Sequence, residues 1–413
     1  MSSASFSVTQ VQQQIQNAIL PINTSQQISL NAGLNRTLAS DIIATMNVPA
    51  FDNSAMDGYA FCSQDLAVHP ELAVVGQSYA GHPFRDQLQP GQAIRITTGA
   101  AMPNHADSVL PQEFAVLKDA STLAMRNIVI QAGQNRRLCG EDIALGSTVV
   151  SKGRRLGPAE LGLLASLGLS TISVQRQLRI AIFSTGDELR SIDQTLDSGS
   201  VYDSNRVTLH AMLSQFGAEV LDLGVLADNP TTIETALKNI VDKADVIITS
   251  GGISAGAADF TKQVMQQLGH MNFWAINMRP GRPLAFGIIN KNQLSDPTYV
   301  FGLPGNPVAM MVSFYFFVRP ALQLLSGSNI SMTPTINAIS TEAIVKKAGR
   351  TEFQRGICAV DAMGELRVGI TGEQGSAMLS SMTRANCLIV LNPEQGNIVA
   401  GDKVQVMLFD GLI

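Results

Sequence analysis

The chain has 413 residues, a formal net charge of −5 and a pI near 5.6. Hydrophobic residues make up 45% and charged residues 15%, a balance that excludes an intrinsically disordered chain and predicts substantial buried cores. Because a single core stops growing at roughly 250 to 300 residues, we expect three or four domains. The acidic balance argues against a nucleic-acid-binding protein, which usually carries a strongly basic face.

The chain shows no targeting or membrane signal. Its N-terminus lacks the basic and apolar segments of a signal peptide, and the longest apolar run, Val308 to Val318, is shorter than the roughly 20 residues that span a bilayer. We therefore expect a cytoplasmic protein without a membrane segment. The cysteines contain no C-x-x-C pair and are predicted to be reduced structural thiols rather than zinc ligands or disulfides. They are Cys62, Cys139, Cys358 and Cys387.

The first part of the chain mixes helical and strand patterns. Apolar residues recur at helical spacing from Val8 to Ile19, and a second apolar helix is predicted to begin at Pro158. Between them, short β-branched runs and turn residues predict a β-rich insertion over 47–140. This insertion would divide one linking domain, with a helical and β structure, into the segments 1–46 and 141–177.

From residue 178 onward, apolar strands alternate with helical segments. Strand-like runs such as "LRIAIFS" and "DVIITS" are separated by helical patterns such as "NRVTLHAMLSQFG" and "TTIETALKNIVDKA". This rhythm is typical of βαβ units and predicts an open, mainly parallel α/β sheet over 178–326. Short alternating runs after a Ser/Gly linker predict a small C-terminal β domain over 327–413.

Acidic and glycine-rich segments follow four of the predicted strands. Because ligands bind at the carboxyl ends of strands in open α/β sheets, these segments are expected to converge at one edge. They contain Asp187 and Glu188, then Asp228, then Gly251, Gly252, Ser254, Gly256 and Asp259, and finally Pro304, Gly305 and Asn306.

Each of these segments by itself also fits an ordinary helix cap or turn. Together, several carboxylates at one edge repel one another unless a cation or protons compensate them, which makes a Mg²⁺ site plausible. A glycine-rich loop that opens a helix offers free backbone N–H groups to a phosphate. The glycine spacing matches neither G-x-x-x-x-G-K-[ST] nor G-x-G-x-x-G, which weakens an ATPase or a dehydrogenase interpretation.

Two further groups of polar residues are candidates for binding. Arg279 and Arg282 surround a Pro-Gly turn, where two guanidinium groups favour an anion between them, although a solvated charged turn is the alternative. The predicted insertion carries polar loops with Asp57, Thr98 and Asp142, which also fit ordinary turns. Composition alone does not place these loops beside the sheet.

Eight motifs in order resemble the molybdopterin molybdenumtransferase family. They are "FDNSAMDGYA", "RITTGA", "GEDI", "STGDEL", "TSGGISAGAADFTK", "PGRPLAFG", "GLPGNPVA" and "GRTEFQRG". The match runs through nearly the whole chain and is similar to the stand-alone bacterial form, and to one half of the plant and animal fusion proteins. The resemblance implies an elongated, L-shaped, four-domain subunit that forms a homodimer.

The resemblance also implies a reaction. In this family, adenylated molybdopterin and molybdate are the substrates, Mg²⁺ is required, AMP is released, and molybdenum cofactor is the product. A transient molybdopterin adenylyltransferase partner is expected. By resemblance, Asp187, Glu188, Asp228 and Asp259 belong to the metal and phosphate side of the pocket, and Arg279, Arg282, Arg350 and Ser376 to the molybdate side. Asp57, Thr98 and Asp142 match loops that reach the cleft from the partner subunit in this family.

The chain departs from the family at one motif. The family usually has lysines in K-P-G-K-P, where this chain has Arg279 and Arg282. Arginine presents a planar fork rather than a compact point charge, so we expect altered affinity for molybdate or altered discrimination against tungstate. A smaller departure is Cys139, where the family often has a basic residue.

Two other functions stay open at this point. A scaffold paralogue would retain the fold and bind the pterin without catalysing the transfer, and the arginine pair is its only support. A Mg²⁺-dependent nucleotide hydrolase would turn over ATP without a pterin, and the missing P-loop lysine weakens that interpretation.

Overall fold

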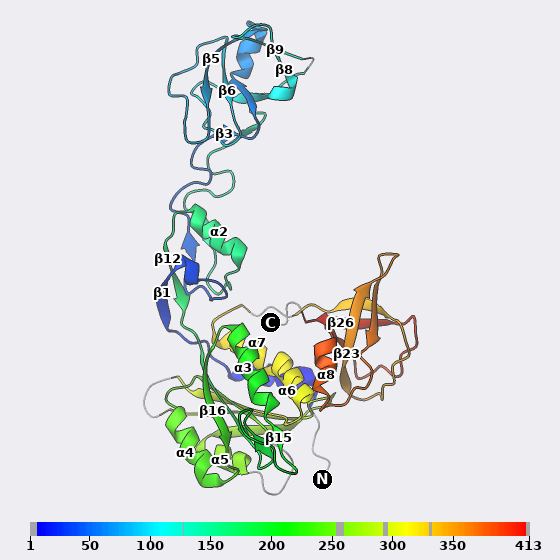
Figure 1. Cartoon of the computed structure of the whole chain (residues 1–413). Coiled ribbons are helices and arrows are strands. Elements are labelled where there is room, and N and C mark those ends of the chain that lie inside the picture. Colours follow the sequence, from blue (N-terminus) through cyan, green and yellow to red (C-terminus); the bar gives the residue numbers. More distant parts are fainter. Residues whose placement is uncertain (1–5, 127, 253–259, 292–295, 330–332, 410–413) are drawn as a thin grey trace.

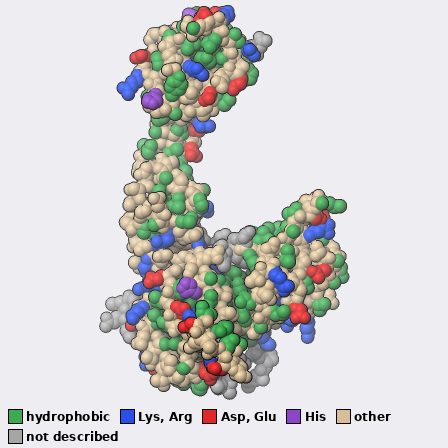
Figure 2. Space-filling view, in the orientation of Figure 1, with side chains coloured by type: hydrophobic (Ala, Val, Ile, Leu, Met, Phe, Trp, Pro, Cys, Tyr) green, Lys and Arg blue, Asp and Glu red, His purple; other side chains and the backbone are tan. Residues whose placement is uncertain are grey.

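The chain forms an elongated, multidomain molecule. The computed structural model describes residues 6–126, 128–252, 260–291, 296–329 and 333–409. A small β-rich unit lies at one end, a narrow linking region follows, and an α/β unit and a second β-rich unit lie side by side at the other end, so that the outline is L-shaped (Figure 1). On the face in Figure 2, the described basic and acidic side chains are interspersed and form no continuous basic band.

The β-rich unit at the far end is a six-stranded sheet. Alternate side chains of its second strand enter different cores, with Tyr59 and Phe61 on one face and Ala60 on the other. The order of its strands is β7 (Ser108–Pro111), β4 (Gly58–Phe61), β6 (Gln92–Ile96), β5 (Leu72–Ser78), β9 (Thr122–Met125) and β8 (Ala115–Leu117). The short helices η2 (Ser63–Ala67) and η3 (Gln112–Phe114) and the strand pair β3 (Asn53–Ser54) and β10 (Arg136–Arg137) complete this unit.

The linking region contains two short antiparallel strand pairs and one α-helix. Leu38, Leu156, Leu164 and Val174 form its small core. The helix begins at Pro158, as the sequence predicts, because proline is favourable at the first helical position. The elements are β1 (Ser25–Ser29) with β12 (Thr171–Gln175), β2 (Ile42–Ile43) with β11 (Thr148–Val150), η1 (Leu30–Ala32) and α2 (Pro158–Ser166).

The first helix, α1 (Val8–Ala18), does not belong to the linking region. Its buried residues Val11 and Ile15 join the same core as the strands and helices of the α/β unit. The sequence pattern assigned this helix to the linking domain with the rest of 1–46. Helical spacing identifies an apolar face but not the partner that covers it, so the assignment is corrected for this helix.

The α/β unit contains a mixed six-stranded sheet. Four neighbouring strands are parallel, as the βαβ rhythm predicts, and two further strands extend the sheet at one side, each antiparallel to the strand before it. The order is β16 (Glu219–Leu226), β13 (Arg179–Thr185), β17 (Val246–Ser250), β21 (Thr298–Leu303), β20 (Pro283–Ile289) and β18 (His270–Ala275). The sequence did not indicate β20, because the Pro-Gly turn at Pro280 and Gly281 made the following residues resemble a loop.

Helices cover both faces of this sheet. Along β13, Ile180 and Ile182 enter one core while Ala181 and Phe183 enter the other, as expected for a strand buried on both faces. The first core receives α1, α3 (Ser204–Phe216), α6 (Pro307–Ser313), the π-helical segment η4 (Phe314–Val318) and α7 (Arg319–Leu325). The second receives α4 (Pro230–Ile240) and α5 (Phe260–Leu268). A short strand pair, β14 (Leu189–Arg190) and β15 (Val201–Tyr202), lies after β13.

One helix in the described part of the chain is long and apolar enough to cross a membrane. Pro307–Leu325 has 19 residues and a mean hydropathy of 1.6, so the helix is longer than the apolar run from Val308 to Val318. It continues past Val318 through Arg319, whose Nη1 donates a hydrogen bond to Thr333 Oγ1 at 2.9 Å. Since 72% of the apolar window is buried inside the protein, the helix belongs to the core.

The C-terminal unit is a closed β-barrel. The pairing of β23 with β25 joins the two ends of a five-stranded order, and a short strand from the α/β unit, β19 (Met278–Arg279), adds to β23. Val368, Cys387, Ile389 and Val406 lie in its core. The order is β23 (Thr351–Val360), β24 (Leu366–Ile370), β22 (Ile336–Ser340), β26 (Lys403–Leu408) and β25 (Cys387–Leu391), and α8 (Leu379–Arg384) packs beside it.

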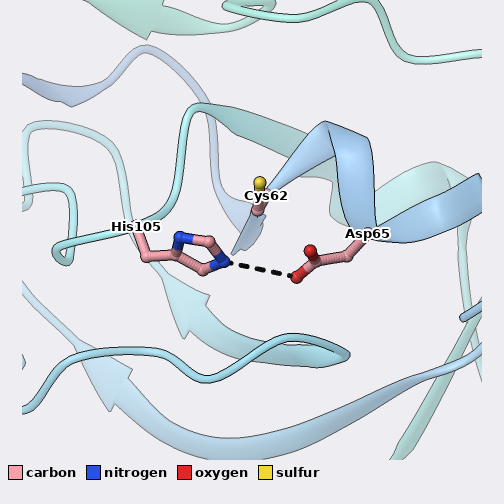
Figure 3. A group of neighbouring side chains, drawn as sticks. All are labelled: Cys62, Asp65 and His105. Carbon is pink, nitrogen blue, oxygen red and sulfur yellow. Dashed lines mark ion pairs between the residues drawn. The ribbon is translucent and has the colours of Figure 1, made fainter. Parts of the chain in front are cut away.

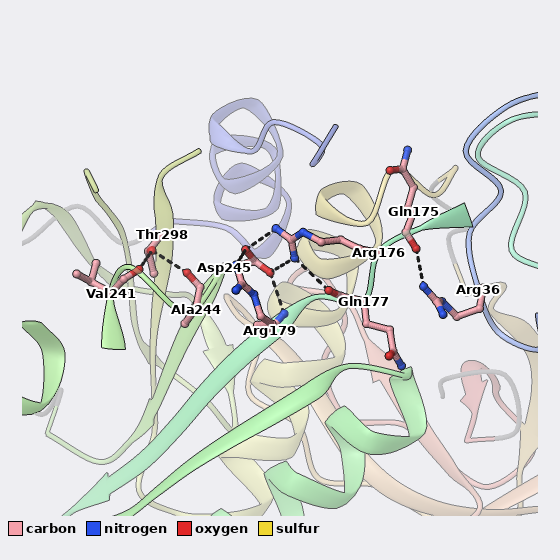
Figure 4. Close-up of polar contacts among 9 residues, drawn as sticks. All are labelled: Arg36, Gln175, Arg176, Gln177, Arg179, Val241, Ala244, Asp245 and Thr298. Carbon is pink, nitrogen blue, oxygen red and sulfur yellow. Dashed lines mark hydrogen bonds and ion pairs between the residues drawn. The ribbon is translucent and has the colours of Figure 1, made fainter. Parts of the chain in front are cut away.

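A buried carboxylate anchors the linking region to the α/β sheet. Asp245, which is 3% exposed, accepts hydrogen bonds from Arg176 Nη1 and Nη2 at 2.6 and 2.8 Å and from the Arg179 amide at 2.8 Å (Figure 4). Nearby, Thr298 Oγ1 donates to the Ala244 carbonyl at 2.9 Å. These bonds secure the start of β13 at the point where the chain enters the sheet.

We expect Asp245→Ala to destabilise the α/β unit by about 3 to 5 kcal/mol, because it leaves a partly buried guanidinium group without its counter-charge. The single tryptophan, Trp274, is buried in this unit, so its fluorescence during urea unfolding reports the change. Asp242→Ala removes an exposed carboxylate from the same loop and serves as the control. Equal midpoints for the two variants would contradict the anchoring role.

Candidate functional site

One large pocket lies between the α/β unit and the barrel. Its volume is about 1150 Å³, and residues from the carboxyl ends of β13, β17 and β21 line it together with the arginine-bearing turn and a loop of the barrel. These three strand ends therefore converge at one edge of the sheet. The predicted residues that line the pocket are Glu188, Gly251, Gly252, Arg279, Arg282, Pro304, Gly305, Asn306, Arg350 and Ser376.

Acidic residues gather at the sheet edge. Asp187 and Glu188 are exposed in the turn after β13, and Asp228 is half-buried in the turn between β16 and α4. Burial, followed by the negative charges of Asp187 and Glu188, raises the pKa of the Asp228 carboxyl above its usual value. The three acids therefore repel one another across two loops, and the group favours a bound cation or proton.

Part of the glycine-rich loop lies outside the described residues, including Ser254, Gly256 and Asp259. Gly252 has φ +65°, and a Cβ there would lie 2.5 Å from Thr261 Oγ1, so this position requires glycine. The Gly251 amide donates to the Leu303 carbonyl at 3.1 Å. The expectation of free backbone N–H groups is therefore wrong at Gly251, whose N–H bonds to the end of the neighbouring strand β21.

The arginine-bearing turn forms the opposite side of the pocket. Arg279 and Arg282 are both exposed and flank Gly281, which has φ +97°. A Cβ at Gly281 would lie 2.8 Å from Ser313 Oγ, so the turn packs closely on the helix α6. The backbone of Arg279 in β19 also lies opposite that of Glu352 in the barrel strand β23, where the two strands pair. The turn is therefore held on both sides.

The barrel contributes the remaining predicted residues. Arg350 donates from Nε to Glu352 Oε1 at 2.9 Å, and Glu352 is 1% exposed. Ser376 lies in the loop before α8, where its Oγ accepts a hydrogen bond from Asn306 Nδ2 at 3.0 Å and its carbonyl accepts one from the Val308 amide at 3.1 Å. The α/β unit and the barrel are thus joined at the pocket itself.

Sequence reasoning missed several pocket residues, of which Asn205 has the clearest contacts. Asn205 Nδ2 donates to Ser250 Oγ and to the Gly305 carbonyl, both at 2.7 Å, which joins two of the strand-end loops. Its Oδ1 is buried and has no hydrogen-bond partner in the described protein. The only sequence signal here is the helix cap that Asp203 supplies to α3. The other missed lining residues include Thr185, Asp203, Gln374 and Gly375.

Three predicted residues lie away from this pocket. Asp57 accepts hydrogen bonds from the amide and the hydroxyl of Thr98, at 2.7 and 2.8 Å, and these bonds lower the pKa of its carboxyl. Asp142 lines a separate pocket of about 470 Å³ with Arg137 and Glu141. None of the three lines the large pocket. Asp57 and Thr98 adjoin strands β4 and β6 of the far β-rich unit, which lies at the opposite end of the molecule from the α/β unit (Figure 1).

A second cluster of possible ligands lies in the far β-rich unit. Cys62, Asp65 and His105 have donor atoms within 4.8 Å of one another (Figure 3). Cysteine spacing did not indicate this group, since its members come from separate segments. Asp65 Oδ2 accepts a hydrogen bond from the Gly91 amide at 3.0 Å and lies 3.7 Å from His105 Nε2, so the carboxylate already has a partner within the protein. All four cysteines are unpaired, and only Cys139 is exposed.

The fold and the site define a multidomain α/β protein whose pocket has an acidic side and a cationic side. Residues 6–168 match the MoeA N-terminal region (domain I and II), 181–324 a probable molybdopterin binding domain, and 337–409 the MoeA C-terminal region (domain IV). These three matches cover the linking region with its insertion, the α/β unit and the barrel.

Relatives match over nearly the whole chain. The chain is 41% identical over 396 residues to a molybdopterin molybdenumtransferase of Haemophilus influenzae, covering 95% of this chain and 96% of that protein. It is 32% identical to gephyrin of Dictyostelium discoideum, covering 94% of this chain and 60% of gephyrin. A crystal structure of the molybdopterin biosynthesis moeA protein of Pyrococcus horikoshii matches with a TM-score of 0.82 and 25% identity, covering 98% and 100% of the two chains. The chain therefore belongs to the molybdopterin molybdenumtransferase family.

The repulsion among the acids predicts that Asp228→Asn stabilises the ligand-free protein. A carboxyl whose pKa is raised on folding opposes folding when ionised, so its removal should increase the free energy of unfolding at pH 7 by at most about 1 kcal/mol, because solvent screens these groups. The gain should disappear as the pH falls through the raised pKa towards about 4, where the carboxyl is protonated. Urea unfolding in the presence of a chelator, monitored by the fluorescence of Trp274, measures both effects.

The control for this prediction is Asp193→Asn, which removes an exposed carboxylate elsewhere in the α/β unit. It changes the net charge of the protein by the same amount as Asp228→Asn. If both variants changed the free energy of unfolding equally at pH 7, the stabilisation would reflect overall charge rather than the acidic group.

Proposed function

We propose that this chain inserts molybdenum into molybdopterin, with adenylated molybdopterin and molybdate as substrates and with release of AMP. The single observation that carries the proposal is the pocket itself, because one cavity is lined by Glu188, with Asp187 and Asp228 as its acidic neighbours, and by three arginines. An adenylated pterin and an oxyanion are both anionic, so they require a cation at the acids and direct contacts at the arginines. Family membership supplies the identity of the substrates.

The acidic side fits Mg²⁺. Carboxylate oxygens are ligands that Mg²⁺ prefers, and the raised pKa of Asp228 reflects a surplus of negative charge that a divalent cation would neutralise. Asp187, Glu188 and Asp228 would hold the ion together with Asp259. When bound, Mg²⁺ would offset the charge of the phosphoanhydride that is broken as AMP leaves. Asn205 and the glycine turn at Gly252 shape the neighbouring cavity floor.

The cationic side fits molybdate. Arg279, Arg282 and Arg350 line the pocket beside Ser376, so charge-assisted hydrogen bonds and one hydroxyl are available to a tetrahedral oxyanion. Glu352 already engages Arg350, which leaves the other two arginines as the main source of free positive charge in this part of the described pocket. These residues would orient molybdate towards the pterin dithiolene.

We further propose that the protein acts in the cytoplasm as a homodimer. Asp57, Thr98 and Asp142 lie too far from the pocket of their own chain to contact a ligand there, and in a dimer they would complete the pocket of the second copy. A transient molybdopterin adenylyltransferase partner would deliver the adenylated pterin.

Removing two acids tests the enzymatic proposal. Glu188→Ala combined with Asp228→Ala should reduce the rate of cofactor formation at least 100-fold, because the cation that offsets phosphoanhydride charge loses its ligands. The assay uses adenylated molybdopterin, molybdate and Mg²⁺, with AMP release and cofactor formation as readouts. Asp242→Ala is the matched exposed-acid control. Wild-type protein that binds the pterin without turnover would instead establish a scaffold, and ATP hydrolysis without a pterin would establish a nucleotide hydrolase.

The arginine pair tests the recognition of molybdate. Arg279→Lys combined with Arg282→Lys keeps both charges but removes the planar forks, so we expect molybdate to bind about tenfold more weakly. We expect the ratio of the molybdate and tungstate dissociation constants to change as well. Equilibrium titration of both oxyanions with wild type and double variant measures both effects. Identical constants for the two proteins would contradict a role for the arginine geometry.

A further inference from the structure

Three side chains with metal-binding donor atoms gather in the far β-rich unit, away from the large pocket. The donor atoms of Cys62, Asp65 and His105 all lie within 4.8 Å of one another, and His105 Nε2 lies 3.7 Å from Asp65 Oδ2 (Figure 3). Tetrahedral ligands at about 2.0 to 2.3 Å from a metal ion lie about 3.3 to 3.7 Å apart, so a movement of about 1 Å would complete the set.

The local fold brings these donors together from two segments. Cys62 directly precedes the 3₁₀-helix η2, and Asp65 lies in its first turn, three residues later. Because residues three apart lie above one another in a 3₁₀-helix, the thiol and the carboxylate share one side of η2. His105 comes from the loop between β6 and β7. Asp107 fastens that loop to η2, since its carboxylate accepts hydrogen bonds from the amide and the hydroxyl of Ser63, both at 2.8 Å.

The donor atoms are available to a ligand. Among the described residues, none forms a hydrogen bond with the Cys62 thiol. The amide of Gly91 donates to Asp65 Oδ2 at 3.0 Å, a contact of the kind that orients a carboxylate ligand without using all of its lone pairs. The His105 side chain is 34% exposed whereas Cys62 is buried, so an ion can enter from the side of the imidazole.

An ordinary ion pair between Asp65 and His105 accounts for only part of this arrangement. The distance of 3.7 Å is too long for a hydrogen bond, and the pair makes no use of the buried thiol. His105 also has φ +78°, in the left-handed region that residues with a Cβ seldom adopt. A partly exposed ion pair offsets little of that backbone cost, whereas a bond to a metal ion would offset more of it.

We propose that Cys62, Asp65 and His105 bind a divalent transition-metal ion of the zinc class, with water as the fourth ligand. A thiolate, an imidazole and a carboxylate suit Zn²⁺, whereas Mg²⁺ takes oxygen ligands. Cys62 binds as the thiolate, so its proton passes to solvent when the metal binds. The ion would fasten the loop of residues 97–107 to η2. This site is separate from the large pocket, and the inference does not depend on the proposed function.

The first test uses Co²⁺ as the probe, because a thiolate ligand gives Co²⁺ a charge-transfer absorption band in the near ultraviolet that oxygen ligands do not give. The full-length protein is freed of metal with a chelator, kept reduced with a phosphine and titrated with Co²⁺. We expect one equivalent to produce the band and Zn²⁺ to abolish it by displacement, since Zn²⁺ binds more tightly than Co²⁺ to such ligands. About a hundredfold excess of Mg²⁺ should leave the band unchanged.

Variants assign the band to these residues. Cys62→Ser should remove the band, and His105→Gln should weaken Co²⁺ binding at least tenfold, because even residues that only support a ligand change metal affinity by about 10- to 100-fold. Cys139→Ser removes the exposed cysteine, and His82→Gln removes an exposed histidine of the same β-rich unit. Both control variants should bind Co²⁺ as the wild type does.

The second test measures hydrogen exchange of the backbone amides in residues 97–107. We expect Zn²⁺ to slow this exchange in the wild type and to leave it unchanged in His105→Gln, because the metal joins the loop to η2. Zn²⁺ that binds at the acidic group of Asp187, Glu188 and Asp228 would not change the exchange in this distant loop.

Several outcomes would overturn the inference. They are a wild-type protein without the band, a band that persists in Cys62→Ser, and wild-type affinity in His105→Gln. If Cys62→Ser does not fold, His105→Gln decides the question, since its side chain is more exposed. Unchanged exchange in residues 97–107 would contradict the fastening of the loop. Neither assay uses a pterin or molybdate, so failure here would leave the proposed function unaffected.

Discussion

The pairing of β19 with β23 determines how the rest of the site is arranged. Two residues of the α/β unit, Met278 and Arg279, pair with Thr351 and Glu352 of the barrel, so a short strand from one domain joins the sheet of the other. The Thr351 amide also donates to the Asn277 carbonyl at 3.0 Å. A short backbone ladder holds two domains in register more precisely than exposed ion pairs, because each bond has a defined direction. Together with the hydrogen bonds from Asn306 and Val308 to Ser376, this pairing gives the barrel loop a defined position relative to the strand ends.

That register keeps charges of opposite sign on different sides of one cavity. The acids follow parallel strands of the sheet, whereas the arginines come from the Pro-Gly turn and from the barrel. Salt bridges to Asp187, Glu188 or Asp228 would neutralise the arginines, yet Arg350 pairs with the barrel's own Glu352. Anionic and cationic groups that are held apart retain their charge for ligands. Domain arrangement, rather than any single residue, therefore produces the chemistry of the pocket.

Sequence patterns predicted the helices and parallel strands well because their apolar spacing reflects burial on both faces. They located the acids near the sheet edge for the same reason, since a strand's end marks a position in space. They failed where a contact is decided by tertiary structure. The helix α1 has an apolar face with no indication of its partner, and Asn205 resembles a residue beside a helix cap. The charge of Arg355 suggests an exposed position, although its side chain is buried like its neighbours in β23.

The same crowding of like charges that favours ligands also opposes folding. Burial and two neighbouring acids raise the pKa of Asp228. Burial and a neighbouring arginine lower the pKa of Arg355. In both cases the charged form is less favourable than in water, and a ligand of opposite sign relieves the cost. Since the surrounding cores are large and apolar, the α/β sheet and the barrel can sustain these unfavourable charges. The stability of these cores therefore allows the pocket between them to keep groups of like charge close together.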